Sequence, residues 1–183
     1  MKAIVTTLAI AILAVGCATT APHQEFAEIL QRAGQGDPAA QAEAGHCYQY
    51  GDGVTKDPTK AYAWNLKAAN QGNAMAQHNL AVMLDEGIDI PEDNATAVEW
   101  YRKSAEQGHP AAQLNLAIMY WRGEGVKQDL EQAWNLLNTV RMSSPNKQAQ
   151  WQARAALDEI KKELGVTTDS FSYPEWNVLQ QSR

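Results

Sequence analysis

The chain of 183 residues is poor in cysteine and has no excess of basic residues. Its two cysteines are Cys17, at the end of an N-terminal apolar segment, and Cys47. With Cys17 in that segment, Cys47 stands alone in the body of the chain, so an internal disulfide is excluded. A net charge of −6 and a pI near 5.2 argue against a nucleic-acid partner and against a polybasic membrane-binding surface.

The sequence also lacks the spacings that mark common catalytic and metal sites. It has no cysteine and histidine set at zinc-ligand spacing and no Gly-x-Ser-x-Gly nucleophile elbow. The motifs GDGV (51–54) and GEGV (123–126) lack the Lys-Ser/Thr of a phosphate-binding loop, so they indicate turns. If His46 and His78 approach one another, they form at best a weak metal-binding or pH-sensing pair. We expect no catalysis, no cofactor and no small-molecule substrate.

What the chain does have is a unit of 36 residues that recurs three times without a gap. Ala40-Gln41 returns as Ala76-Gln77 and as Ala112-Gln113. Other positions that repeat at this offset are Gly51, Gly87 and Gly123; Asp57, Asp93 and Asp129; and Ala61, Ala97 and Ala133. A period of this length indicates a solenoid, in which each unit contacts its neighbours. Solenoids of this kind usually bind other molecules and seldom catalyse reactions.

Each unit is predicted to be a helix, a turn and a second helix. In the second unit, Leu80, Met83 and Leu84 fall at helical spacing, Gly87 ends the first helix, and Asp93 can cap the second. We expect helix pairs over 37–51 and 58–71, 74–86 and 94–107, and 110–122 and 130–141, with no β-sheet. The position of Cys47 in the unit holds methionine in the other two copies, so Cys47 is predicted to be an unreactive core thiol. Trp64 and Trp100 are predicted to pack between helices.

The segments QGNAMAQHNLAVM (71–83) and QGHPAAQLNLAIMYWRGEGVKQD (107–129) resemble the Sel1-like repeat (SLR), a relative of the tetratricopeptide repeat. The resemblance covers about 37–140, and EFAEILQRAGQG (25–36) reads as a leading half repeat. It implies an all-α solenoid of about three repeats that binds a protein. Asp89 departs from the pattern, standing where the other copies have Gly53 and Gly125, and aspartate tolerates the left-handed region better than most residues.

The N-terminus has the layout of a secretory signal peptide over 1–16. Lys2 precedes an apolar run that ends at Val15, too short to favour a membrane span of about 20 residues. The residues LAVGC (13–17) resemble a bacterial lipobox, which implies lipidation at Cys17. Ala18 lacks the aspartate associated with inner-membrane retention, which implies a lipid anchor in the outer membrane facing the periplasm. The alternative is ordinary cleavage near Ala21, which discards Cys17.

The remaining segments complete the predicted layout. A linker over 17–22 leads into the repeat solenoid over 23–145. A capping helix over 146–164 follows, starting near Ser144-Pro145 and burying Ala153, Leu157, Ile160 and Leu164. An aromatic-containing tail covers 165–183.

The outer side of each first helix is predicted to line a concave groove that binds a partner. At 100° per residue, the slots on this side lie opposite the core stripe and vary among the copies. Their occupants are His46, Gln49 and Tyr50; His78, Val82, Asp85 and Glu86; and Leu114, Ile118, Trp121 and Arg122. The alternative is that these slots vary because they are unconstrained solvent surface.

The third copy carries the predicted hot spot. Leu114, Ile118 and Trp121 make its first helix apolar on the side opposite the core, so either a partner or the C-terminal tail should cover them. Trp121 and Arg122 are residue types that often dominate interface energetics. We expect a scaffold or adaptor lipoprotein that binds a protein partner in the cell envelope. The alternative is an immunity lipoprotein that neutralises a periplasm-acting toxin enzyme.

Overall fold

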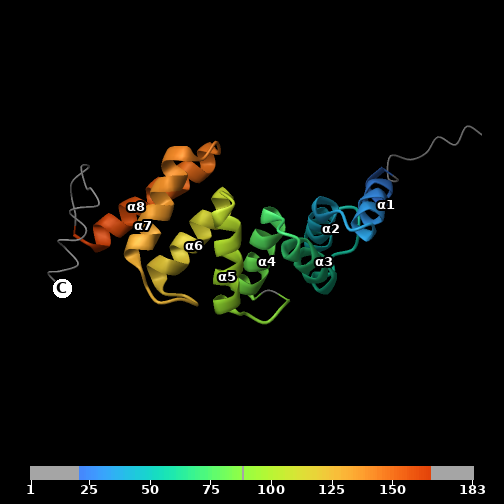
Figure 1. The fold of residues 1–183 in the computed structure, drawn as a ribbon, viewed down its shortest axis with the longest axis horizontal. Coiled ribbons are helices and arrows are strands. Elements are labelled where there is room, and N and C mark those ends of the chain that lie inside the picture. The colour runs from blue at the N-terminus through green and yellow to red at the C-terminus, as the bar shows by residue number, and fades with distance from the viewer. Residues whose placement is uncertain (1–20, 88, 166–183) are drawn as a thin grey trace, which may run out of the picture.

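The computed structural model describes residues 21–87 and 89–165, and over these ranges the chain forms helices joined by turns, with no strand (Figure 1). The helices are α1 (Ala21–Gly34), α2 (Pro38–Tyr50), α3 (Pro58–Asn70), α4 (Ala74–Glu86), α5 (Asn94–Glu106), α6 (Pro110–Arg122), α7 (Leu130–Ser143) and α8 (Lys147–Glu163). The predicted all-α class is confirmed, and the six helices expected in the repeats begin and end within two residues of the observed bounds. None of the described helices is long and apolar enough to cross a membrane.

Capping side chains explain why the helices recur at a fixed interval. Asn73, before α4, accepts a hydrogen bond from the amide of Ala76 at 2.9 Å, and Asp93, before α5, accepts one from the amide of Thr96 at 3.0 Å. Glycines in the left-handed region end the first helices, with φ of 84°, 62° and 73° at Gly51, Gly87 and Gly123.

The turns after these glycines also follow the sequence. Asp89 has a φ of 62°, close to the 67° of Gly53 and the 65° of Gly125, and it is the one residue other than glycine with positive φ in the described ranges. The expectation that aspartate replaces a left-handed glycine is therefore confirmed.

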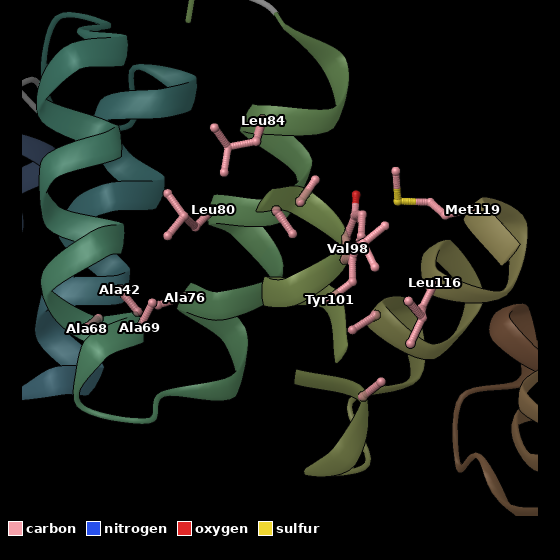
Figure 2. Packing of buried hydrophobic residues seen from close by; sticks show 14 residues of the cluster. Ala42, Ala68, Ala69, Ala76, Leu80, Leu84, Val98, Tyr101, Leu116 and Met119 are labelled. Carbon is pink, nitrogen blue, oxygen red and sulfur yellow. The ribbon is translucent and has the colours of Figure 1, made fainter. Parts of the chain in front are cut away.

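Successive helices pack side by side into an elongated array with α1 at one end and α8 at the other (Figure 1). The apolar core runs along the array between the helices. Figure 2 shows its central part, where Leu80 of α4 and Tyr101 of α5 are fully buried and Leu116 of α6 is 3% exposed. Each repeat therefore completes its core against the next one, as in other solenoids.

The recurring glutamine after each conserved alanine has a structural role. The side-chain amide of Gln77 donates to the carbonyl of Ala69 at 3.1 Å, and its oxygen accepts from Gln107 at 2.7 Å. The same bonds recur one repeat earlier around Gln41 and Gln71. A buried glutamine with both ends satisfied fixes the contact between consecutive helices.

In the second helices, the residue after each predicted packing tryptophan is the more deeply buried one. Asn65, Tyr101 and Leu137 are fully buried, whereas Trp64 and Trp100, one residue earlier, are only partly buried. Lys67 and Lys103 lie over the two indole rings, 4.2 and 3.9 Å from their centroids. Both tryptophans pack against the apolar core as predicted, and each ring is also covered in part by a lysine side chain.

The C-terminal helix matches the predicted range 146–164 to within one residue at each end, although its first turn comes after Ser144-Pro145. Ser144 ends α7, its amide donating to the carbonyl of Val140, and Asn146 caps α8 by accepting from the amides of Gln148 and Ala149. The start near Ser144-Pro145 is corrected to Lys147. The predicted signal peptide, the predicted lipidation site Cys17 and the predicted tail after Gly165 lie outside the described residues.

Candidate protein-binding groove

Five of the predicted binding residues converge on one open groove between the first helices of the second and third repeats. Val82, Asp85 and Glu86 come from α4, and Ile118 and Arg122 come from α6. They surround a cavity of about 260 Å³, whose other lining residues are Tyr101, Asn115, Met119 and Glu124. Residues from two repeats therefore form one surface.

Tyr101 forms the base of this groove and orients two of its polar side chains. Its hydroxyl donates to Oδ2 of Asp85 at 3.1 Å and accepts from the amide of Asn115 at 3.0 Å. Burial, with the nearby Asp85 charge, raises the pKa of the phenol well above its usual value, so the hydroxyl stays protonated and can donate. The network links α4, α5 and α6 at the groove.

The groove is acidic with an apolar wall. Asp85, Glu86 and Glu124 bring three carboxylates, and Arg122 is the one cation in the lining. Arg122 lies 3.8 Å from Glu124, and both side chains are largely exposed. Such a surface can bind a segment that carries basic and apolar side chains.

His78 lies beside this groove and does not line it. Its ring centroid is 4.9 Å from that of His109 and 5.9 Å from that of Tyr101. Burial, then the neighbouring His109, lowers the pKa of His78 to about 4. The imidazole is therefore neutral at physiological pH and acts as a packing residue.

The first-repeat residues lie elsewhere. His46 contacts Tyr50 with ring centroids 4.6 Å apart and lies 3.5 Å from Asp52, in a separate cavity of about 380 Å³ against α1. The suggested His46–His78 pair is replaced by His78 beside His109. In the described part of the chain, no group of three histidine, cysteine or acidic residues is arranged to hold a metal ion. Gln49 is partly buried and Tyr50 is 63% exposed.

Of the four predicted binding residues in the third repeat, two are covered by α8 and two remain at the groove. Leu114 is 7% exposed and belongs to the core shared with α7 and α8, so it does not lie open on the predicted groove. Trp121 packs against the same core, and its Nε1 donates to Oε2 of Glu163 in the last turn of α8 at 2.7 Å. Ile118 and Arg122 remain at the groove. The second apolar face is thus covered in large part by this chain's own helix.

Sequence reasoning missed Tyr101, Asn115 and Glu124 as groove residues. Tyr101 is fully buried. Its hydroxyl nevertheless reaches a polar surface formed by the preceding and following helices. The one signal in the sequence is the polar end of a tyrosine in a slot that Leu137 fills in the third copy.

The helix pairs, their caps and the shared core define an α-solenoid of helix-turn-helix repeats. The model of the Sel1 repeat matches residues 38–73, 74–109 and 110–138, more than half of the chain. The chain therefore belongs to the Sel1 repeat family. Proteins of this family commonly serve as scaffolds for protein–protein interaction and are generally not catalytic. No curated protein matches the chain significantly.

Solved structures agree with this assignment. A protective antigen of uropathogenic Escherichia coli with an SLR fold is 32% identical over 88% of this chain and 34% of its own, with a TM-score of 0.69. A Sel1 repeat protein of Oxalobacter formigenes is 30% identical over 74% of this chain and 55% of its own, with a TM-score of 0.66. Cysteine-rich protein B of Helicobacter pylori, 15% identical over 70% of this chain and 95% of its own, shares the fold with a TM-score of 0.57. The chain spans about a third of the first relative and about half of the second.

Proposed function

We propose that this protein is a periplasm-facing lipoprotein that acts as a scaffold or adaptor, and that it binds a protein partner in the groove between α4 and α6. The observation that carries the proposal is the convergence of Val82, Asp85, Glu86, Ile118 and Arg122 on one cavity. These slots vary among the repeats, whereas the core slots around them keep their small or apolar character. That is expected where one side of each first helix holds the fold and the other meets a ligand.

The charge of the groove specifies the chemistry of the partner segment. Three carboxylates against one guanidinium favour lysine or arginine in the partner, and Val82 and Ile118 favour an apolar side chain next to it. Tyr101 holds Asp85 in place, which lowers the entropy that the side chain loses on binding. The lipid at Cys17 would keep the groove close to the envelope.

The test is capture of the partner from crosslinked envelope with full-length wild type and two charge-reversal variants. Glu86→Lys changes the groove, and Glu106→Lys is its matched control. Both glutamates are exposed and each is the last residue of a 13-residue helix, but Glu106 lies outside the groove lining. We expect Glu86→Lys to reduce the captured protein at least about fivefold and Glu106→Lys to leave it unchanged.

The captured protein also separates the two roles. An envelope assembly component supports the scaffold. A secreted toxin enzyme that loses activity on binding supports the immunity role. Equal capture by both variants would refute the groove as the binding surface.

A further inference from the structure

The C-terminal helix α8 is built as the first helix of a fourth repeat. Its N-cap, Asn146, comes 37 residues after His109, the N-cap of α6. Gln150 donates from its side-chain amide to the carbonyl of Ser144 at 2.7 Å, as Gln113 does to the carbonyl of Ala105 at 3.2 Å. Because α8 corresponds to α6, the side of α6 that packs on α7 shows which side of α8 would pack on the second helix of a fourth repeat.

Among the described residues, none covers that side of α8. In the third repeat, the corresponding slots hold Leu114 and Ala117, which are buried together with Trp134 of the second helix α7. In α8 the same slots hold Trp151 and Arg154. Trp151 is 66% exposed and Arg154 is exposed, and no described helix follows α8 to cover them. Trp151 and Arg154 therefore give this side of α8 one apolar and one basic side chain that the described residues leave exposed.

Trp151 and Arg154 line a cleft between α7 and α8 with a volume of about 590 Å³, which we call the α7–α8 cleft. The two helices lie at the end of the array farthest from α1 (Figure 1). The lining residues of the cleft are Trp134, Asn138, Arg141, Lys147, Gln150, Trp151, Arg154, Leu157, Asp158 and Lys161. Four of these are basic and one is acidic, although the chain as a whole carries a net charge of −6.

The basic side chains are arranged to receive carboxylates. Arg141 is held by the side chain of Asn138, whose oxygen accepts from its Nε and Nη2 at 3.2 and 3.0 Å. Asp158 lies 3.8 Å from Lys161, which leaves Lys147 and Arg154 without an ion-pair partner in the described residues. Arginine pairs with carboxylates through two parallel hydrogen bonds, so Arg141 and Arg154 suit an acidic ligand.

The size of Arg154 prevents a helix from packing as closely here as it does in the three repeats. The equivalent slot holds Gly45, Ala81 and Ala117 in the three repeats, where the second helix comes close. A Cβ added at Gly45 would lie 2.7 Å from the amide of Asn65. An arginine in this slot keeps a helix at a greater distance and leaves room for an extended segment.

We propose that the α7–α8 cleft binds an acidic segment of a protein partner in an extended conformation. Carboxylates of the segment pair with Arg141, Lys147 and Arg154, and an apolar side chain lies on Trp151. This surface is independent of the groove between α4 and α6, which is acidic and fits a basic segment. The two surfaces would let one chain hold two segments of opposite charge.

The experiment measures binding of the full-length protein to a fluorescein-labelled short peptide of glutamate and phenylalanine by fluorescence anisotropy. We expect Arg154→Glu to weaken binding about tenfold and Trp151→Ala about fivefold. Lys162→Glu is the matched control, because Lys162 is exposed on the same helix and does not line the cleft. It should change the affinity less than about twofold, and added salt should weaken wild-type binding.

Several results would overturn the proposal. One is an equal loss of affinity in Arg154→Glu and Lys162→Glu, which indicates non-specific charge attraction. Another is binding that tightens about tenfold in Asp169→Lys, which identifies the chain's own residues 166–183 as the occupant. A third is Arg154-dependent binding to phosphatidylglycerol vesicles without binding to the peptide, which identifies a lipid surface. If Arg154→Glu lowers the melting temperature, the affinity of Trp151→Ala is compared with that of Lys162→Glu instead, because Trp151 is exposed and its loss should not unfold the protein.

Discussion

The indole Nε1 of Trp121 donates a hydrogen bond to Oε2 of Glu163 at 2.7 Å, which joins the third repeat to the last turn of α8. Leu114, seven residues earlier on α6, is buried in the core that α8 completes. The apolar face that the sequence offered as a partner hot spot is therefore mainly an internal contact. We therefore expect substitutions in this face to lower the stability of the fold more than they weaken partner binding.

Trp121→Ala is expected to destabilise the protein by about 2–3 kcal/mol, because it removes a partly buried ring and a hydrogen bond. Trp121→Phe keeps most of the packing and should cost about 1 kcal/mol. Urea denaturation of the full-length protein measures both changes. An unchanged free energy of unfolding in Trp121→Ala would mean that α8 does not pack on the third repeat.

The repeat itself could be predicted from the sequence because its caps and small core residues recur at one offset. Asp93, Gly87 and Asp89 each require a particular backbone conformation, so their positions set the helix ends. The covering of Leu114 could not be predicted in this way. The offset changes from 36 to 37 residues at Asn146, and Arg154 replaces the small residue that marks the slot elsewhere. The period is lost where α8 begins, although the packing continues.

The candidate groove could be predicted only in part. The rotation of 100° per residue places residues that are three or four positions apart on the same side of a helix. On this basis the sequence correctly grouped the groove residues Val82, Asp85, Glu86, Ile118 and Arg122. His78 and Leu114 share a slot at the border of that side. His78 is covered by Tyr101 of α5 and by His109, and Leu114 is covered by α7 and α8. These contacts join residues that are distant in the sequence, and the spacing of residues along one helix carries no information on them.

Gly45→Ala is expected to destabilise the first repeat, although alanine normally favours a helix by about 1 kcal/mol over glycine. The new Cβ would lie 2.7 Å from the side-chain amide of Asn65, which is fully buried and cannot turn into solvent. We expect a net loss of about 1–2 kcal/mol in the free energy of unfolding, measured by urea denaturation.

A double-mutant cycle tests the cause of that loss. Asn65→Ala removes the amide, whose Oδ1 is buried without a hydrogen-bond partner. In the Asn65→Ala background, Gly45→Ala should be neutral or stabilising, which gives a coupling energy of about 1–2 kcal/mol. Additive effects would show that the contact between Gly45 and Asn65 does not limit the packing of α2 on α3.

Cys17 is expected to carry the lipid anchor. Labelling cells with a fatty-acid probe should mark the wild type and Cys47→Ser but not Cys17→Ser. Cys47 is 7% exposed, and burial raises the pKa of its thiol, so it is a poor acceptor. Label that survives Cys17→Ser would exclude the lipobox interpretation and favour cleavage near Ala21.

Acid should destabilise the fold through His78. The pKa of this imidazole is about 4 in the folded protein and 6.5 in the unfolded chain, so the unfolded chain binds the proton first as the pH falls. The stabilisation is therefore complete above pH 6.5 and is lost between pH 6.5 and 4, by about 3 kcal/mol in total. Burial also lowers the pKa of the adjacent His109, which acts in the same direction.

The measurement is urea denaturation at several pH values for wild type, His78→Leu and His46→Ala. Leucine is the residue that the third copy has in the slot of His78, at Leu114. His78→Leu should flatten the decline in stability between pH 6.5 and 4, and the carboxylates that titrate in this range contribute equally to all three proteins. His46 is half exposed on α2, so His46→Ala should keep the full decline. An unchanged slope in His78→Leu would show that water or an acidic side chain compensates the imidazolium, and that the His78–His109 contact does not control the acid response.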